Sequence, residues 1–192
     1  YIYCDWGVSM IRRGEPDRGA DLFYTYVDNA YGTHDWAECM ALNFTFEEFN
    51  PPKTGLLGGG ESPHNWAAAF YVVYLRNLML HEEGDTLHIA PASPRKWLAQ
   101  PQQWGVEEAP SYFGKVSYHM QADPDRTTIR GDVKLDPKRK PAKLLIHVRG
   151  LGGRGIKSAK LNGKEWNAFY GDTIVVSKPD NAITMDVKYE NE

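Results

Sequence analysis

The spacing of apolar residues changes along the chain at Gly84. Before Gly84 the spacing is helical: residues 3–13 predict one helix, and Pro16 begins a second, with an apolar stripe formed by Ala20, Phe23, Tyr24 and Val27. Because only two residues separate these segments, we expect an antiparallel helical hairpin.

A third helix is predicted from about Pro63 to Glu83, directly after three glycines at 58–60. Ser62 is a preferred helix N-cap, and Pro63 suits the first helical position because its φ is fixed and it lacks an N–H. The segment is apolar nearly all round, which predicts a buried helix. Upstream of it we expect a helical turn over residues 33–40 and a loop over 43–60.

After Gly84 apolar and polar residues alternate, which predicts strands. The predicted strands are 86–89, 114–120, 128–135, 143–148, 156–161, 173–176 and 182–189, with one helical turn around Lys96–Leu98. Asn162–Gly163 between two of these strands is a strong signal for a two-residue hairpin. Regular short strands with such turns predict an antiparallel β-sandwich.

The chain is therefore predicted to be α+β, with helices over residues 1–84 and a β-sandwich over residues 85–192. Three helices cannot cover a nearly all-apolar helix on every side. We expect the helical part to pack on further helices outside this chain, on the sandwich, or on a second copy of itself. An exposed apolar face of this kind usually marks an interface.

Charge is uneven along the chain, although the net charge is only −3. Residues 134–164 carry 10 Lys and Arg against the single acid Asp136. A basic block can bind nucleic acid, but here the basic residues alternate with strand-like apolar ones and no nucleic-acid-binding motif accompanies them. We interpret the block as a solvated strand face and expect no nucleic-acid partner.

Neither a membrane span nor a cysteine framework is predicted. No apolar run is long enough to cross a bilayer. Cys4 and Cys39 give no disulfide framework and no metal-ligand spacing. We expect two buried free thiols, with a Cys4–Cys39 bridge as the alternative.

Candidate chemistry lies in two segments, residues 33–38 and 58–66. The first contains Trp36 and Glu38, and the second contains Glu61, His64, Asn65 and Trp66. A carboxylate beside aromatic residues in a loop can act as a general base, which makes Glu38 and Glu61 candidates. Each also has a structural interpretation: Glu38 as a first-turn acid that the helix dipole favours, and Glu61 as a charge beside an N-cap.

A metal site is a weaker hypothesis. His34 and Glu38 stand four residues apart and could face one ion together with His64, but this spacing is a weak signal. We therefore predict no metal ion and no cofactor. His81 and His88 are interpreted as a helix-end residue and a strand-face residue.

Five motifs occur in order along the chain. They are Thr33-x-x-Trp36-x-Glu38, the glycine-rich loop ending in Ser62-Pro-His-Asn-Trp66, Tyr74-Leu-Arg-Asn-Leu-Met-Leu80, Gly84-Asp-Thr-Leu87 and Ala109-Pro-Ser-Tyr-Phe-Gly-Lys-Val-Ser117. Together they resemble the C-terminal end of a six-hairpin glycosidase, more specifically a bacterial α-L-rhamnosidase-like glycoside hydrolase. The resemblance implies the last helical hairpins of an (α/α)6 barrel, followed by a C-terminal β-sandwich.

The same resemblance implies roles for the candidate residues. Glu38 would be the general base that activates water in an inverting reaction on plant or complex glycans. Trp36, His64 and Trp66 would contact the sugar at the barrel mouth, with Glu61 and Asn65 beside them. The partner would be carbohydrate, and the protein would be bacterial, in the periplasm or outside the cell.

In that family the general acid belongs to an earlier hairpin. This chain begins at Tyr1, without a methionine and after the position of that hairpin, so we expect the natural start to lie upstream. General-acid assistance and enclosure each contribute orders of magnitude to the rate, so the chain alone should have negligible activity. Two other functions remain open: a carbohydrate-binding sandwich without catalysis, and a structural unit that oligomerises through its helices.

Overall fold

The computed structural model describes residues 2–28, 30, 36, 39–40, 58–59 and 63–190. The chain divides into two compact units, Tyr1–Arg76 and Asn77–Glu192. The first unit is helical and the second consists mainly of two β-sheets, which confirms the α+β class. No helix in the described part of the chain is long and apolar enough to cross a membrane.

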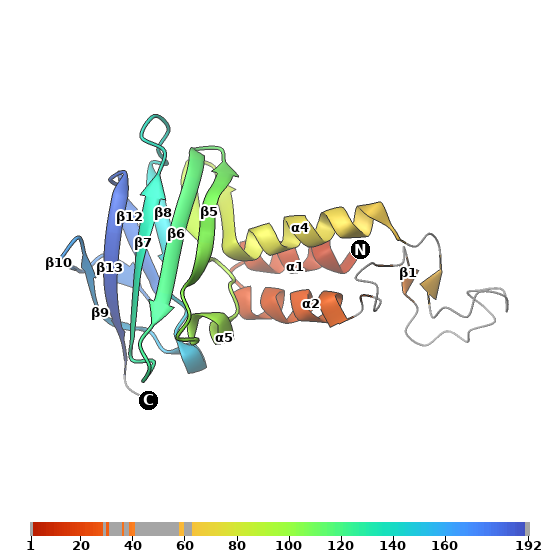
Figure 1. Cartoon of the computed structure of the whole chain (residues 1–192), viewed down its shortest axis with the longest axis horizontal. Coiled ribbons are helices and arrows are strands. Elements are labelled where there is room, and N and C mark those ends of the chain that lie inside the picture. Colours follow the sequence, from red (N-terminus) through yellow and green to blue (C-terminus); the bar gives the residue numbers. More distant parts are fainter. Residues whose placement is uncertain are drawn as a thin grey trace. The chain divides into compact units, whose positions relative to one another are not determined.

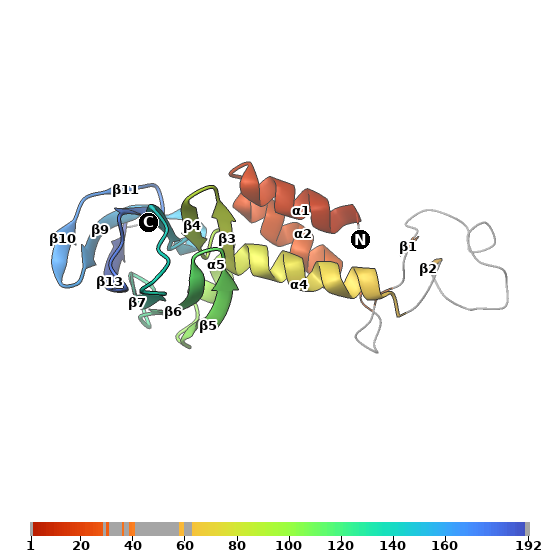
Figure 2. The same ribbon diagram turned by 90° about the horizontal axis from the view of Figure 1, so that it is seen from above.

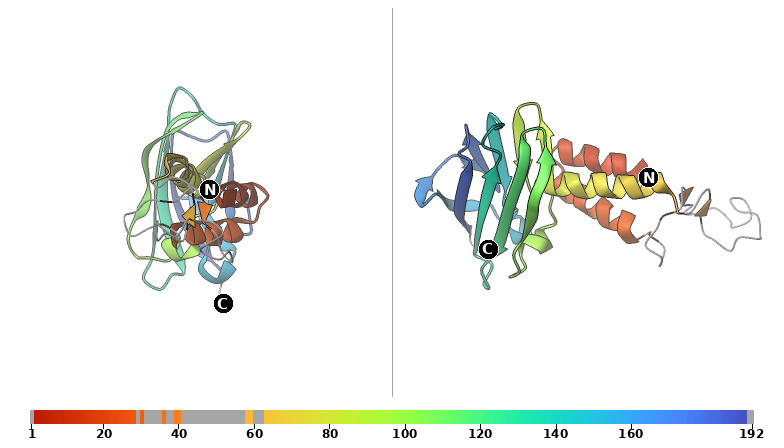
Figure 3. Two further views of the ribbon diagram at one scale, coloured as in Figure 1. Left: turned by 90° about the vertical axis from the view of Figure 1, so that its right-hand side faces the viewer. Right: turned by 45° about the horizontal axis from the view of Figure 1, so that its top comes forward.

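The helical unit is built from α1 (Ile2–Arg12), α2 (Pro16–Asp28) and most of α4 (Asn65–Met79). The three helices lie side by side (Figures 1 and 3). α1 and α2 run antiparallel, as their short connection predicts. Their buried apolar residues include Ile11, Ala20, Phe23, Tyr26 and Tyr74.

Two glycines allow these helices to approach closely. A Cβ atom at Gly7 would lie 1.6 Å from the Tyr74 hydroxyl, and one at Gly19 would lie 2.6 Å from Cγ1 of Ile11. The fully buried Tyr74 donates its hydroxyl hydrogen to the Gly19 carbonyl. The bond joins α4 to α2, and Gly7 leaves room for the same ring against α1.

Helix α4 departs from the prediction in two ways. It begins at Asn65, with His64 as its capping residue, and the predicted cap Ser62 lies outside the described residues. It is also not buried all round, because Trp66, Val72 and Val73 are 62%, 64% and 48% exposed. Helix α4 therefore carries more apolar residues than the described part of the helical unit buries.

The predicted continuation of this helix to Glu83 is wrong. The chain instead forms β3 (Leu80–Glu83), which pairs antiparallel with β4 (Thr86–Ile89). Gly84 and Asp85 make the turn between them, and Gly84 adopts a φ of 58°. Pairing with β4 provides hydrogen-bond partners for backbone groups of residues 80–83. The sequence of this segment is equally compatible with a helix.

The second unit is a sandwich of two sheets, seen as two layers in Figure 2. The six-stranded sheet has the order β10-β9-β13-β7-β6-β5, and the five-stranded sheet has the order β11-β12-β8-β4-β3. The remaining strands are β5 (Trp104–Ser111), β6 (Gly114–Ala122), β7 (Thr128–Leu135), β8 (Lys143–His147), β9 (Ile156–Leu161), β10 (Lys164–Trp166), β11 (Phe169–Tyr170), β12 (Thr173–Ser177) and β13 (Ala182–Tyr189). Two short helical elements, α5 (Arg95–Leu98) and η1 (Leu151–Gly153), complete it.

All seven predicted strands are present, but the sandwich is not wholly antiparallel. β4 pairs parallel with β8, because the chain leaves the five-stranded sheet after β4, builds three strands of the other sheet, and then returns. The predicted Asn162–Gly163 hairpin is confirmed: Leu161 pairs with Lys164, and both turn residues have positive φ. The predicted turn at 96–98 is α5.

The sandwich core lies between the two sheets. It is formed by alternate residues of both, including Tyr118, Met120, Leu144, Ile146 and Ile174, all with no exposed surface. The basic block lies largely on solvated positions, since Lys143, Lys157 and Lys160 are exposed on strands. Arg149 is the exception: it is buried and donates to the Pro91 carbonyl at 3.2 Å.

Two core tyrosines should make the stability of the sandwich depend on pH in the alkaline range. Tyr118 donates its hydroxyl to the Met79 carbonyl at 2.9 Å, and Tyr189 donates to the Val148 carbonyl. Burial raises the pKa of both phenols well above their usual value of 10. Above pH 10 the unfolded chain therefore loses protons that the folded chain keeps, so stability is lost as the pH rises.

We expect the free energy of unfolding to fall above pH 10 by about 1.4 kcal/mol per pH unit for each tyrosine. Urea unfolding between neutral pH and pH 11 measures this slope. Tyr118→Phe should lose about 1 kcal/mol at neutral pH, with its hydrogen bond, and show a shallower alkaline slope. An unchanged slope in Tyr118→Phe and Tyr189→Phe would contradict the assignment.

Candidate functional site

The two candidate segments meet through their backbones. Cys39 and Met40 form β1 (Cys39–Met40), which pairs antiparallel with β2 (Gly58–Gly59). The N–H of His64 also donates to the Trp36 carbonyl at 2.9 Å. The strand β1 corrects the predicted helical turn at residues 39–40, and β2 corrects the predicted loop at residues 58–59. Of residues 33–38 the structure describes only Trp36, so the rest of that turn stays a prediction.

The paired residues lie on either side of the two candidate carboxylates, Glu38 and Glu61, in the sequence. Glu38 stands between Trp36 and Cys39, and Glu61 stands between Gly59 and His64. Each flanking residue of the first segment is therefore bonded to a flanking residue of the second. Glu38 and Glu61 themselves, and His34 of the weaker metal hypothesis, lie outside the described residues, so their roles stay predictions.

Trp36 is held by aromatic contacts in the helical unit. Its ring stacks on Tyr26 and on Tyr71, with centroid distances of 5.2 Å in both cases. Its indole N–H donates to the Tyr26 carbonyl at 3.0 Å, and the Tyr26 hydroxyl donates to the Ala67 carbonyl at 2.7 Å. With 9% of its surface exposed, Trp36 is part of the core of the helical unit. Its contact with a sugar stays a prediction.

His64 has a structural role at the start of α4. Its Nδ1 accepts a hydrogen bond from the Ala67 N–H at 3.2 Å, which satisfies one of the donors that a helix N-terminus leaves open. Acceptance at Nδ1 places the proton of the neutral ring on Nε2. Asn65, the first residue of α4, is exposed.

Trp66 lies on the solvent side of this helix start. It is 62% exposed, and its ring centroid lies 6.4 Å from that of Phe70 and 6.5 Å from that of His64. These three rings form an aromatic patch over the first turns of α4. An exposed aromatic face offers a large, rigid apolar surface for a ligand to pack against, and the neighbouring Asn65 adds a polar group.

A second cluster of titratable side chains lies on the five-stranded sheet. His81 on β3, His88 on β4 and His147 on β8 form a row, which we call the histidine row. The rings of His81 and His88 stack at 4.2 Å, and those of His88 and His147 at 5.4 Å. The interpretation of His81 as a helix-end residue is wrong, because it lies in a strand; the strand-face interpretation of His88 is confirmed.

Burial favours the neutral form of His88 and His147 in this row. Burial lowers the pKa of His88, although the Glu83 carboxylate opposes the shift. Burial also lowers the pKa of His147 to about 3, and the neighbouring His88, His81 and Arg149 add to the effect. Neutral imidazoles can bind each other through one N–H and one lone pair, as His88 and His147 do here.

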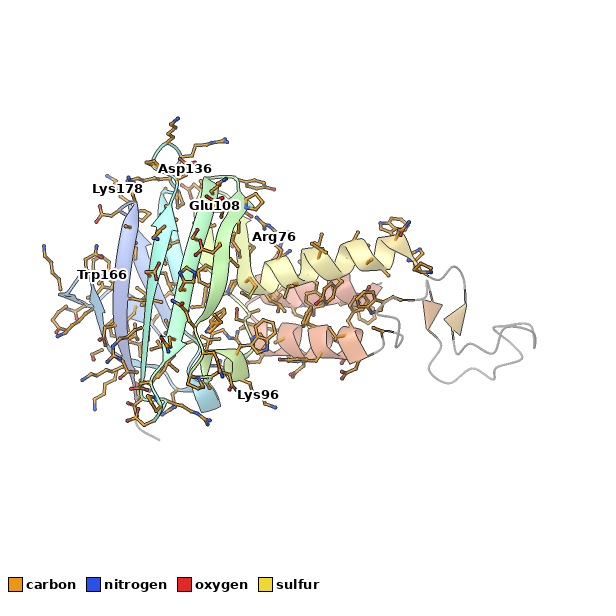
Figure 4. All side chains as sticks on the ribbon, in the orientation of Figure 1. Arg76, Lys96, Glu108, Asp136, Trp166 and Lys178 are labelled. Carbon is orange, nitrogen blue, oxygen red and sulfur yellow. The ribbon has the colours of Figure 1, made fainter. Side chains whose placement is uncertain are left out.

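A pocket of about 340 Å³ lies at the β10 edge of the sandwich. Trp166, labelled in Figure 4, lines it together with Lys164, Glu165, Lys178 and Asp180. The indole N–H of Trp166 donates to the carbonyls of Ala168 and Val175, both at 3.2 Å, which fixes the ring.

Sequence reasoning missed the residues that hold the site together. The predicted stripe on α2 includes Tyr24 but not Tyr26, whereas in the structure Tyr26 is buried and Tyr24 is 38% exposed. Tyr71 lies within the predicted third helix, with no role assigned to it from the sequence. The histidine row had no sequence signal, because its members are separated by up to 66 positions and only the sheet order joins them. In comparisons with known proteins, the sequence matches no protein-family model and no curated protein.

Proposed function

We propose that this chain is the C-terminal portion of an inverting, α-L-rhamnosidase-like glycoside hydrolase of the six-hairpin class. Glu38 acts as its general base, the aromatic patch of His64, Trp66 and Phe70 contacts the sugar, and Trp36 positions the Glu38 segment. One observation carries the proposal. The Thr33–Glu38 motif and the 58–66 loop, far apart in sequence, are joined by the His64–Trp36 bond and the β1–β2 pair.

The exposed apolar residues of the helical unit support the same proposal. Trp6 on α1 and Val72 and Val73 on α4 are 55%, 64% and 48% exposed. In an (α/α)6 barrel each hairpin packs between two others, so the last hairpins present such residues to their neighbours. The remaining helices of the barrel would cover these residues and supply the general acid.

Hydrolysis of aryl α-L-rhamnosides by the longer natural protein tests the proposal. We expect release of the aryl group by that protein and negligible release by the 192-residue chain under the same conditions. General-acid catalysis typically contributes about 10²–10⁴-fold, and the chain alone would lack it. Turnover by the purified 192-residue chain would contradict the proposed division of the catalytic residues.

The pocket beside Trp166 favours a second function, carbohydrate binding by the sandwich without cleavage. A fixed aromatic ring beside two lysines and two acids can bind a polar ligand through an apolar face and several hydrogen bonds. A glycan array separates the two possibilities. Binding that is lost in Trp166→Ala and kept in Trp66→Ala would favour the sandwich site over the aromatic patch.

A further inference from the structure

We propose that the β3–β4 hairpin binds a zinc-type divalent transition-metal ion through His81, Glu83 and His88. The inference concerns the sandwich unit alone and does not rest on the proposed hydrolase function. No metal ion was predicted from the sequence, because the ligands are spread over two strands and are brought together by the hairpin register.

The register places all three side chains on one face of the sheet. His81 pairs directly with His88, and Glu83 pairs with Thr86. Residues directly opposite each other in an antiparallel pair project to the same face, as do residues two apart on one strand. Glu83 therefore lies beside the His81–His88 pair, while Leu80, Leu87 and Ile89 project to the other face, into the core.

The three side chains already hold one potential ligand atom each close together. One ligand atom from each of His81, Glu83 and His88 lies within 4.8 Å of the other two. His88 Nε2 lies 3.7 Å from Glu83 Oε2. A tetrahedral zinc ion with ligands at about 2.0–2.1 Å holds them roughly 3.3 Å apart, so modest side-chain rotation suffices.

The other nitrogen of His88 is held in the manner of a metal ligand. His88 Nδ1 lies 3.2 Å from His147 Nε2, and His147 Nδ1 lies 3.1 Å from the Thr173 hydroxyl. Thr173 in turn donates to Asp172 at 3.3 Å. Metal-binding histidines characteristically engage their second nitrogen with a protein partner, which orients the ring toward the ion. In this row His147 is the positioning residue.

The donor set indicates the kind of ion. Two imidazoles and one carboxylate suit Zn²⁺ or Co²⁺ and leave a fourth position for water, whereas Mg²⁺ prefers oxygen ligands. Access is available through Glu83, whose side chain is 74% exposed. The hairpin that carries these residues is drawn in Figure 2, at the β3 edge of its sheet.

A different histidine offers a matched control. His119 on the other sheet contacts Glu107 at 2.8 Å through Nε2 and Asp132 at 3.5 Å through Nδ1. The two carboxylates lie at opposite nitrogens of the ring. Among the described residues, His119 belongs to no group of three side chains whose ligand atoms converge as those of His81, Glu83 and His88 do. His119→Gln removes a histidine whose side chain is 22% exposed, on the other sheet, and leaves the hairpin intact.

The test titrates the ¹⁵N-labelled chain with ZnCl₂ and follows the ring nitrogens of each histidine by NMR. We expect the signals of His81 and His88 to shift and those of His119 to stay unchanged. This readout uses the unaltered chain and does not depend on whether any variant folds. No shift at His81 and His88, or an equal shift at His119, would overturn the proposal.

Calorimetry on two variants completes the test. Glu83→Gln, an exposed substitution of nearly the same shape, should weaken Zn²⁺ binding by at least about tenfold, because loss of a direct ligand should cost no less than the 10–100-fold typical for loss of a group that only supports a ligand. His119→Gln should bind Zn²⁺ as the unaltered chain does, and MgCl₂ should give no binding to either. Equal affinity of Glu83→Gln and the unaltered chain would overturn the assignment of Glu83.

Discussion

In the longer hydrolase that we propose, replacing Glu38 by glutamine should lower kcat for aryl α-L-rhamnoside hydrolysis by about 10²–10⁴-fold. Glutamine keeps the size of the side chain and its hydrogen-bonding capacity but cannot accept the proton of the attacking water. KM should change little, because the carboxylate acts on water and contributes mainly in the transition state. Steady-state kinetics of the purified variant measures both quantities.

Glu15→Gln is the matched control for this change. Glu15 lies just before α2 in the same helical unit and forms ion pairs with Arg13 and Arg18, whose side chains are 76% and 70% exposed. Glu15 itself is 28% exposed, but both arginines lie largely in solvent, and ion pairs of this kind contribute little to stability, so Glu15→Gln should keep full activity. Full activity in Glu38→Gln would show that another group activates the water.

Replacing the two tryptophans of the site, Trp36 and Trp66, should have very different effects on stability. Trp36→Ala should destabilise the helical unit by about 3–5 kcal/mol, because it leaves a cavity beside Tyr26 and Tyr71 and removes the bond to the Tyr26 carbonyl. Trp66→Ala should change the stability by less than about 0.5 kcal/mol, because the ring is mostly exposed. Urea unfolding followed by near-ultraviolet circular dichroism measures both.

The effect of Trp66 should be on sugar binding rather than on stability. If the aromatic patch contacts the sugar as proposed, Trp66→Ala in the longer hydrolase should raise KM by roughly fivefold, the loss of about 1 kcal/mol of aromatic contact, with the fold intact. Trp36→Phe keeps a ring against both tyrosines and should recover most of the stability lost in Trp36→Ala. A Trp66→Ala variant with unchanged KM would remove the aromatic patch from the substrate site.

Much of the fold follows from local patterns. β4, β7, β9 and β13 have the predicted bounds, because each alternates apolar and polar residues between clear turn signals. The strands that were missed lack such a pattern. β5 contains a register shift between Val106 and Ala109, with Glu108 at a φ of 48°, which breaks its alternation. β10 and β11 are too short for a period to show.

The helix-to-strand change after Met79 has a different cause. Leu80 to Glu83 continues a helical pattern without a breaker, and only its pairing with Thr86–Ile89 decides the outcome. Tertiary pairing of this kind overrides local preference. The parallel β4–β8 pair likewise depends on the path of the chain between the two sheets, which no local pattern specifies.

The candidate site was predictable in part. The residue types of the 33–38 and 58–66 segments identified them, and the short glycine strand β2 that pairs with β1 carries no strand propensity of its own. The capping role of His64 was assigned instead to Ser62, because histidine is an uncommon cap. The histidine row requires the register of β3, β4 and β8, so it could be found only in the structure.

The configuration of the first sugar released is the most direct measurement of the proposed function. Proton NMR during hydrolysis of an aryl α-L-rhamnoside by the longer protein distinguishes the two anomers before they equilibrate. If Glu38 activates a water molecule opposite the leaving group, β-L-rhamnose should appear first. Release of the α anomer first, or no release of rhamnose at all, would contradict this account.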